Sequence, residues 1–463
     1  MRRPVRCLAA LLVTALLAPT ASAESKRWNV ILITADAMRG QVLPLNGNQE
    51  VTAPHLEGLA AESVNFTRAY TNITTTTPSH ATLLSSLYPQ DHKAYSNRSR
   101  ISSEIVTLPE ILHAHGWHTA AIVNFPWLNP ETSNVPQGLD EIGRGDHVRK
   151  ADKTNAWVMR FLDGRKKQPE KPFFLWIHYI DNHTPYHAPG KYNMMYYPKG
   201  RDPRAGKSGS LQQAWRLFPQ EHRDDDYFKK WLRGITDVDY VVGTYKGSAS
   251  WIDERVGELV ARLKRDGIWD RTLFVFTSDH GESMGEHKLY FVHAGLFEVT
   301  ARIPMIWHLP DGPRGKSVSE LVDLADVMPT ILTQLGLDVP QAARGQDFWP
   351  AVIEGQKSKG AVLLEHAGAQ LEGVVTARYK YIRHRKTRGY YPGYKIKRGR
   401  IELYDLQADP GETRNIANKQ PKIVKMMQGL LKKLRAGERT YQAGDAEIDE
   451  QTEELLRSMG YTQ

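Results

Sequence analysis

The sequence has almost no cysteine. Its one cysteine, Cys7, lies in a stretch with the features of a secretory signal, so the predicted mature chain has no thiol. This excludes disulfides, a cysteine nucleophile and a thiolate metal site. A bacterial lipoprotein anchor is also excluded, because its cysteine would follow the apolar run, whereas Cys7 precedes it.

Long apolar runs are also scarce. The run 8–18 follows three arginines and precedes the small-x-small sequence Ala21-Ser22-Ala23, as in a signal peptide. It is shorter than the roughly 20 residues that span a bilayer, and we find no later membrane-spanning segment. We therefore expect residues 1–23 to be a signal peptide and the mature chain to be exported, either to the periplasm or out of the cell.

Acidic residues are outnumbered. The chain has 61 Lys and Arg against 52 Asp and Glu, a net charge of +9, and removal of the three signal arginines leaves 58 against 52. This balance favours anionic partners without identifying them. With 463 residues, 41% of them hydrophobic, the chain is long and apolar enough for a globular core.

Short apolar runs alternate with helical patterns over most of the chain, which predicts an α/β fold with a mostly parallel sheet. The clearest helical patterns are 54–63 and 251–265. From about Gly373 the pattern changes to short strands at 379–383 and 401–405 and an amphipathic helix at 423–434. We expect a catalytic domain over 24–372 and a small α+β subdomain over 373–463. The expected strands of the sheet are 30–33, 120–123, 173–177, 273–276 and 304–307.

Two polar segments interrupt this pattern, 191–230 and 386–400, and we expect both to be surface loops. The second, KTRGYYPGYKIKRGR, alternates tyrosines with cations. It is either a solvated basic loop or a clamp for a polyanionic substrate. Binding of nucleic acid is disfavoured, because so short a segment is weak evidence for it.

Two expected strands end in acidic residues, one at Asp36 and one at Asp279-His280. In open α/β sheets ligands bind beyond the carboxyl ends of the strands, so these side chains are expected to face one crevice. A single acid after a strand is commonly a helix cap, but an adjacent Asp-His pair can face one cation. Carboxylate and imidazole ligands suit zinc, manganese or a similar divalent ion.

The stretch TTTTPSH, residues 74–80, precedes a short helical pattern. Thr77 is the expected cap and Pro78 the expected first helical residue. Thr76 then lies just ahead of a helix N-terminus, where backbone N–H groups and the helix dipole stabilise an anion. The alternative is that all four threonines form a capping and turn run.

Histidines cluster in two further segments. Histidine is the usual proton donor and acceptor near neutral pH, so each segment offers a general acid. FFLWIHYIDNHTPYH contains His178, Asp181, His183 and His187, and GEHKLYFVHAGLFE, an expected active-site loop, contains His287, Lys288 and His293.

Six motifs occur in an order that resembles the sulfatase branch of the alkaline phosphatase superfamily. The resemblance covers nearly all of the mature chain. It implies an alkaline-phosphatase-like sheet between helices, one divalent metal ion (Mn, Zn, Mg or Ca) and attack on a sulfate or phosphate ester through a covalent intermediate. The motifs are NVILITADAMR, APHLEGLAAESVNFTRAY, PSHATLLSSLYP, FTSDHGESMGEH, LVDLADVMPTILTQLGL and LYDLQADPGETRNIA.

The resemblance assigns the metal ligands as Asp36, Asp279, His280 and Thr76. Thr76 takes the place of the cysteine that sulfatases oxidise to formylglycine. Because threonine cannot be matured in this way, we expect no formylglycine. We expect instead a metal-activated threonine nucleophile, as in superfamily members that act on phosphate esters.

The remaining site residues combine matches with departures. His183 matches the histidine that protonates the leaving group, Asn97 matches an asparagine that contacts the ester oxygens, and Arg39 is expected to orient the site. His80 replaces the signature arginine, and His293 replaces the lysine that holds an oxygen of the ester. The first change weakens the fixed positive charge beside the nucleophile, and a neutral or protonated His293 would make binding of the ester oxygen depend on pH. An acid that usually follows Asp36 is Ala37.

The leading hypothesis is an exported, metal-dependent hydrolase of phosphate mono- or diesters. The alternatives are a sulfuric ester hydrolase acting on a sulfated glycan or an aryl sulfate, a phosphoryl-group transferase, and a non-catalytic anion-binding protein. A second metal would need Asp181, His183 and His293. The expected substrate is an anionic small molecule or an ester on a glycan or polymer. The sequence gives no indication of the oligomeric state.

Overall fold

The computed structural model describes residues 26–144, 150–205, 210–224, 226–356, 359–366, 370–387, 391–437, 441 and 443–445. The expected signal peptide lies outside these residues. In the described part, no helix is both long enough and apolar enough to cross a membrane.

An eight-stranded sheet forms the centre of the molecule, in the order β13-β2-β12-β8-β1-β7-β5-β6. The strands from β8 to β6 are parallel to one another, whereas β12 is antiparallel to both of its neighbours. The mostly parallel sheet is therefore confirmed. The strands are β1 (Asn29–Ala35), β2 (Val64–Phe66), β5 (His118–Val123), β6 (Glu141–Arg144), β7 (Phe173–Tyr179), β8 (Thr272–Thr277), β12 (Met305–His308) and β13 (Lys316–Val318).

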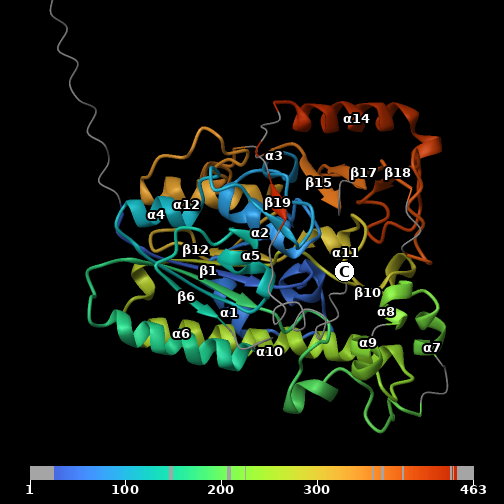
Figure 1. Ribbon diagram of the computed structural model, residues 1–463, viewed down its shortest axis with the longest axis horizontal. Helices are drawn as coiled ribbons and strands as arrows, with labels where there is room; N and C mark the ends of the chain where they lie inside the picture. The colour runs from blue at the N-terminus through green and yellow to red at the C-terminus, as the bar shows by residue number, and fades with distance from the viewer. Residues whose placement is uncertain are drawn as a thin grey trace, which may run out of the picture.

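Helices cover both faces of this sheet (Figure 1). The central strands β1, β7 and β8 are buried throughout, which is why they appear in the sequence as continuous apolar runs. One face packs against α1 (Pro54–Ala61), α6 (Ala151–Arg165) and α10 (Val238–Arg265), and the other against α2 (Thr76–Ser85), α4 (Leu108–Ala114) and α12 (Val327–Leu335).

Helix α10 begins at Val238, well before the expected start at 251. Its first half contains Gly243 and Gly247, which weaken a helical pattern. The structure requires a glycine at the second position, because a Cβ on Gly247 would lie 2.2 Å from the carbonyl oxygen of Tyr192. Close packing against the backbone of Tyr192 therefore explains why a glycine interrupts the helical pattern here, and why this half of the helix was not predicted from the sequence.

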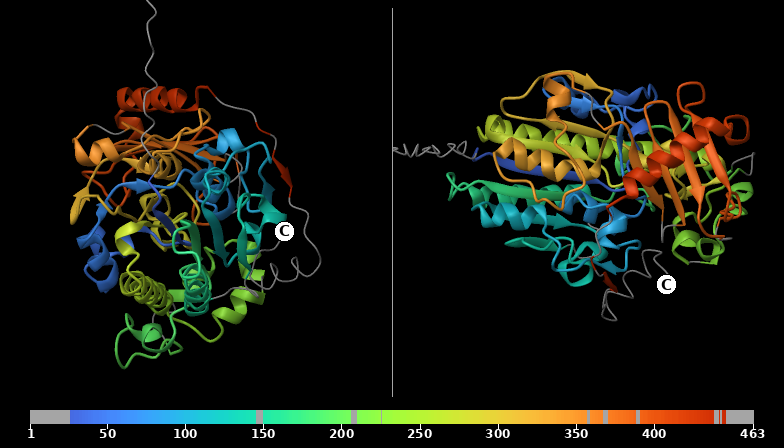
Figure 2. Two further views of the ribbon diagram at one scale, coloured as in Figure 1. Left: turned by 90° about the vertical axis from the view of Figure 1, so that its left-hand side faces the viewer. Right: turned by 90° about the horizontal axis from the view of Figure 1, so that it is seen from above.

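The C-terminal subdomain is an antiparallel sheet covered by one helix. The strands are β15 (Val362–His366), β16 (Leu371–Val375), β17 (Tyr379–His384) and β18 (Ile401–Asp405). Helix α14 (Pro421–Arg435) lies across them, as seen from above in Figure 2. Gly373 lies inside β16, so this sheet begins before the boundary expected at 373.

The segment 191–230 is not the plain loop that was expected. It contains short helices, because Trp215, Phe218 and Phe228 pack against the core beside α10. Its helices are η4 (Gly190–Met194), α7 (Ser210–Trp215), α8 (Gln220–Asp224) and α9 (Asp226–Trp231).

Short elements complete the fold. The small strands are β3 (Ala69–Tyr70), β4 (Ser99–Arg100), β9 (Ser283–Met284), β10 (Tyr290–Val292), β11 (Arg302–Ile303), β14 (Val322–Asp323) and β19 (Gly444–Asp445). The small helices are η1 (Gly40–Val42), η2 (Pro44–Asn46), α3 (Pro89–His92), η3 (Pro126–Leu128), α5 (Pro130–Ser133), η5 (Trp269–Arg271), η6 (Glu286–Lys288), α11 (Glu298–Ala301), η7 (Leu324–Asp326), α13 (Trp349–Ile353) and η8 (Ala417–Lys419).

Candidate functional site

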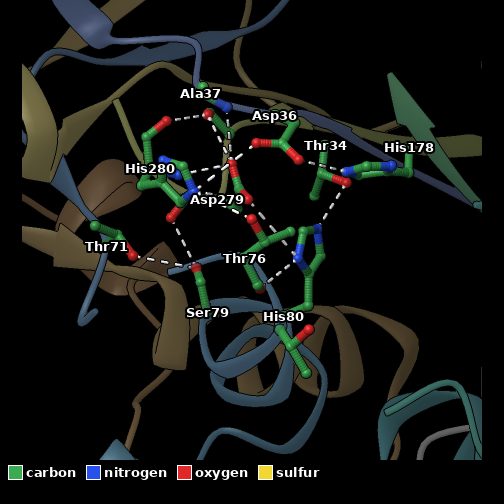
Figure 3. A network of polar contacts seen from close by, with 12 residues as sticks. Thr34, Asp36, Ala37, Thr71, Thr76, Ser79, His80, His178, Asp279 and His280 are labelled. Carbon is green, nitrogen blue, oxygen red and sulfur yellow. Dashed lines mark hydrogen bonds and ion pairs between the residues drawn. The ribbon is translucent and has the colours of Figure 1, made fainter. Parts of the chain in front are cut away.

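Two buried carboxylates meet beyond the carboxyl ends of the neighbouring strands β1 and β8 (Figure 3). Asp279 Oδ1 accepts hydrogen bonds from the backbone N–H groups of Ala37 at 3.1 Å and His280 at 2.8 Å. Its Oδ2 and both carboxylate oxygens of Asp36 have no hydrogen-bond partner among the described residues. The sequence therefore placed these two acids correctly at one edge of the sheet.

His280 adds a nitrogen to this group. Its Nδ1 lies 3.0 Å from the carbonyl oxygen of Gly281, which can only accept, so in the neutral ring Nδ1 carries the proton. The lone pair of Nε2 then faces Asp279 Oδ2 at 3.4 Å and Asp36 Oδ1 at 3.8 Å. The ligand atoms of these three residues lie within 4.8 Å of one another. Unpartnered buried oxygens beside a nitrogen lone pair fit a divalent cation.

The electrostatics of the two acids support the same conclusion. Burial and, to a smaller extent, the nearby charge of Asp36 together raise the pKa of Asp279 to about 6. Burial also acts to raise the pKa of Asp36, but His183, His178 and His280 outweigh it and hold that pKa below its usual value. A cation between the two carboxylates would relieve their repulsion.

Thr76 is buried beside this group and is the first residue of α2. Its Oγ1 lies 3.3 Å from Nε2 of His280. The helix begins two residues earlier than expected, with the extended Thr75 as its N-cap and Pro78 at the third position instead of the first. The first turn is tied to β8, because the Ser79 hydroxyl donates to the carbonyl oxygen of Asp279 at 2.7 Å.

His80 faces the backbone of Thr76. Its Nδ1 lies 2.8 Å from the carbonyl oxygen of Thr76, and its Nε2 lies 3.1 Å from the hydroxyl of Thr34. That hydroxyl accepts from Trp176 Nε1 at 3.0 Å, so its own proton is available to His80. Burial lowers the pKa of His80 to about 3. The ring is therefore neutral, and both of its nitrogens are engaged within the protein.

Two further histidines, His183 and His293, lie next to His280. The ring of His293 lies 4.4 Å from that of His280 and 5.7 Å from that of His183, measured between centroids. The Nδ1 of His183 is 2.8 Å from the carbonyl oxygen of Thr184, which fixes the proton on Nδ1. Burial lowers the pKa of both His183 and His293. Both predicted residues are thus brought into the site.

Asn97 and Arg39 complete the predicted set. The Oδ1 of Asn97 accepts from the backbone N–H of Thr77 at 3.0 Å, beside the nucleophile position. The guanidinium of Arg39 donates to Glu286 at 2.7 Å, and its backbone N–H donates to the hydroxyl of Tyr245 at 3.0 Å. The charge of Arg39 is therefore paired with Glu286.

The sequence did not single out two residues of this network, Thr34 and Glu282. Glu282 is fully buried, neither of its carboxyl oxygens has a partner among the described residues, and burial raises its pKa well above the usual value. His178 was only one member of a histidine-rich segment, yet its Nε2 lies 3.3 Å from Asp36 Oδ2. A polar residue that follows a buried strand was the available signal for Glu282.

Other members of the two histidine-rich segments face elsewhere. Asp181 accepts from the backbone N–H of Ala151 at 3.3 Å and from Trp251 Nε1 at 3.1 Å. His287 stacks on Phe297 with centroids 3.6 Å apart. Within the described ranges, only Asp36, Asp279 and His280 form a group of three or more metal-ligating side chains, so no second-metal group is found there.

The comparison with known families agrees with this geometry. The family model described as Sulfatase matches residues 28–337. The chain belongs to the sulfatase family. A second model, described as N-sulphoglucosamine sulphohydrolase, C-terminal, matches residues 285–439 of this sulfatase-family chain.

Relatives of this sulfatase-family protein carry several activities in their names. The arylsulfatase of Clostridium perfringens is 25% identical and covers 90% of this chain and 96% of its own. The multifunctional alkaline phosphatase superfamily protein PehA of Trinickia caryophylli is 24% identical, and the match covers 84% of this chain and 91% of PehA. The chain is therefore an ester hydrolase of the alkaline phosphatase-like superfamily.

Solved structures show the same fold. The phosphonate monoester hydrolase of Agrobacterium radiobacter superposes with a TM-score of 0.68 at 22% identity, covering 89% of this chain and 96% of its own. A protein solved in complex with its substrate D-glucosamine-2-N,6-O-disulfate superposes with a TM-score of 0.68 at 20% identity. The match covers 89% of this chain and 98% of that protein. The predicted fold class is confirmed.

Proposed function

We propose that this protein is an exported hydrolase of anionic phosphorus esters in which Thr76 is the nucleophile and Asp36, Asp279 and His280 hold one divalent cation. The observation that carries the proposal is the position of Thr76. Its hydroxyl is buried at the first residue of α2 and lies 3.3 Å from the ring nitrogen that faces both carboxylates.

The site fits a hydroxyl that must ionise. A bound divalent cation supplies positive charge that lowers the pKa of a nearby hydroxyl and neutralises part of the ester's charge. The N-terminus of α2 adds backbone N–H groups on the same side. Thr76 then loses its proton to water and attacks as an alkoxide.

The chemistry proceeds in two displacements. The Thr76 oxygen forms a bond to phosphorus while the bond from phosphorus to the leaving oxygen breaks, and His183 donates a proton from Nε2 to that oxygen. The negative ester raises the pKa of His183, which burial otherwise lowers. Water then hydrolyses the phosphothreonine and regenerates the hydroxyl.

The preference for phosphorus over sulfur rests on what replaces the sulfatase signature. Threonine at position 76 cannot give the aldehyde hydrate that releases sulfate. His80 and His293, which stand where the family has cations, both have pKa values lowered by burial. With one divalent ion balancing two carboxylates, the site has little surplus positive charge. It therefore suits a monoanion, such as a phosphate diester, a phosphonate monoester or a sulfate ester, better than a dianionic phosphate monoester. The preference for phosphorus over sulfur thus rests on Thr76, which cannot become formylglycine.

Sulfate ester hydrolysis is the second candidate. The observation in its favour is that curated relatives matching most of the chain are named arylsulfatases. In this case the Thr76 alkoxide would attack sulfur in the same geometry. The aryl sulfate assay below distinguishes the two candidates.

The test is a panel of matched aryl esters, namely a phosphate monoester, a phosphate diester, a phosphonate monoester and a sulfate, each assayed with Mn, Zn, Mg and Ca. Wild type, Thr76→Ala and Thr76→Ser are compared. We expect phosphorus esters to be hydrolysed by wild type, more weakly by Thr76→Ser, and not by Thr76→Ala. Dominant hydrolysis of the sulfate would establish the second candidate instead. Full activity of Thr76→Ala would reject the nucleophile.

Export is part of the proposal and has its own test. The apolar run 8–18 and the Ala21-Ser22-Ala23 sequence support cleavage before Glu24. N-terminal sequencing of the protein recovered from the periplasm or the medium should begin at Glu24. Recovery of the intact chain in the cytosol would contradict it.

A further inference from the structure

Positive charge is concentrated in the C-terminal subdomain. Residues 373–437 contain 17 Lys and Arg against 4 Asp and Glu, whereas the rest of the chain contains 44 against 48. The net positive charge of the protein therefore originates in this one segment. A charge surplus that is confined to one subdomain favours binding of polyanions where its cations are exposed.

Part of this surplus lines a groove at one end of the C-terminal sheet. The groove has a volume of about 640 Å³ and lies between the end of β17 and the last turns of α14. Three of its lining side chains are cations. The groove is lined by Arg383, Gln428, Leu431, Lys432, Arg435 and Ala436.

Structural roles account for only some of these cations. Buried Glu372 pairs with Arg383 and lies 3.2 Å from Arg435, which also pairs with Glu365. Lys432 has no acidic partner within the described ranges, although it also complements the C-terminal dipole of α14. Two carboxylates therefore face three lining cations, and positive charge remains.

The loop between β17 and β18 extends this surplus. Lys395, Lys397 and Arg398 are exposed, and no acidic partner is found for them among the residues that the structure describes. Exposed cations without partners retain their full attraction for an anion. The backbone N–H of Lys397 donates to Nδ1 of His384 at 3.1 Å, so this loop lies beside the end of β17 that contributes Arg383 to the groove.

The groove adjoins the nucleophile segment through one strand. The backbone of Glu365 pairs with residues 72–73, and its N–H donates to the carbonyl oxygen of Asn72 at 2.8 Å. The next residue, His366, places Nδ1 2.8 Å from the hydroxyl of Thr74. Arg435 in the groove pairs with Glu365 itself. A single strand therefore links the groove cations to the segment that contains Thr76.

We infer that this groove is a subsite for anionic groups of an extended glycan that carries sulfate or phosphate, and whose scissile ester lies at Thr76. The inference rests on the proposed function and names its substrate class. Cations beside the amide of Gln428 suit a chain of hydroxyl-rich units with spaced negative charges.

Two other polyanions are disfavoured by the same surface. An anionic membrane needs apolar side chains to insert, and Met426 is the only large apolar side chain of α14 that is exposed. Nucleic acid needs exposed aromatic rings for stacking. Here Tyr394 is buried, with its ring 5.2 Å from that of Phe297, and Tyr391 is only partly exposed.

The test uses the full chain and a labelled heparin octasaccharide as the probe. The groove variant is Arg383→Gln/Lys432→Glu. The matched control is Lys422→Gln/Lys425→Glu, which makes the same change of charge on exposed residues in the first half of α14. Thermal unfolding verifies that both variants fold. Lys432→Glu alone keeps the test valid if the double variant does not.

We expect the groove variant to bind the octasaccharide roughly five- to tenfold more weakly than wild type. This is the effect of losing two surface ion pairs between the protein and the ligand. The control should lose less than about twofold, and KM for an aryl ester should stay unchanged in both. Equal losses in groove variant and control, or no loss in either, would overturn the subsite. Binding to anionic phospholipid vesicles that the groove variant alone loses would replace the glycan with a membrane surface. Thr76→Ala should bind the octasaccharide like wild type. Hydrolysis by Thr76→Ala therefore tests the proposed function, and octasaccharide binding by the groove variant tests the subsite independently.

Discussion

The hydroxyl of Thr76 lies 3.3 Å from the same nitrogen of His280 that faces Asp36 and Asp279. The helix that begins at Thr76 and the strand that ends before Asp279 are thus joined at one point. Under the proposed function, this nitrogen and the two carboxylates would hold the cation that activates the Thr76 hydroxyl.

Removal of the metal should abolish activity. Dialysis against a chelator should reduce ester hydrolysis to the background rate. Zn or Mn should restore the activity better than Ca, because a nitrogen ligand in the set favours transition metals. In thermal unfolding, the same ions should raise the Tm of wild type and not of Asp279→Asn. Asp270→Asn, an exposed acid away from the site, is the control. Full activity after metal removal would contradict the assignment of the three ligands.

The loss of rate on replacing His183 should increase with the basicity of the leaving group. His183→Gln should slow hydrolysis of alkyl esters by roughly 10²-fold or more, the usual contribution of a general acid. Aryl esters with acidic leaving groups need no protonation, so their rates should fall by only a few-fold. Rates measured over a series of leaving groups test this, and a uniform loss across the series would reject the role.

His80 should position Thr76 and not contact the ester. Loss of its two hydrogen bonds in His80→Phe should lower kcat by roughly 10²-fold, because small displacements of a nucleophile are costly, and leave KM nearly unchanged. Thr34→Val should show the same pattern more weakly, and Thr34→Ser should retain activity. A rise in KM, or a shifted pH profile, in His80→Asn would instead place the ring against the substrate.

The protein should lose stability as the pH falls below about 6.5. Burial lowers the pKa of His92 to about 3, whereas an unfolded histidine titrates near 6.5. Protons therefore bind the unfolded chain more tightly, and the free energy of unfolding decreases from about pH 6.5 towards pH 3. His92→Gln should flatten the pH dependence of Tm relative to wild type. His115→Gln, at an exposed position whose ring pairs with no acidic side chain among the described residues, should leave it unchanged. Parallel curves for wild type and His92→Gln would contradict this cause.

The central sheet and the metal group could be predicted from sequence because both follow from the ends of buried strands. Asp36, Asp279 and His280 come directly after continuous apolar runs, and parallel strands bring such residues to one edge. Thr76 was instead singled out by its place next to an expected helix N-terminus and by the family resemblance. These features depend on residues that are close together in the chain.

The features that were missed depend on tertiary contacts. The ring of His80 is neutral because Thr34 and Trp176, from two strands far away in the chain, surround it. The first half of α10 was hidden by Gly243 and Gly247, the second of which its packing against Tyr192 requires. Neither environment can be read from neighbouring residues.

The most direct test of the account is to trap the covalent intermediate. Wild type would be quenched in acid during turnover of an aryl phosphate monoester or phosphonate monoester and digested, and its peptides would be analysed by mass spectrometry. We predict a phosphoryl or phosphonyl adduct on Thr76 that is absent from Thr76→Ala and appears only with substrate and metal present. An adduct on another residue, or rapid turnover of the same ester by Thr76→Ala, would contradict the account.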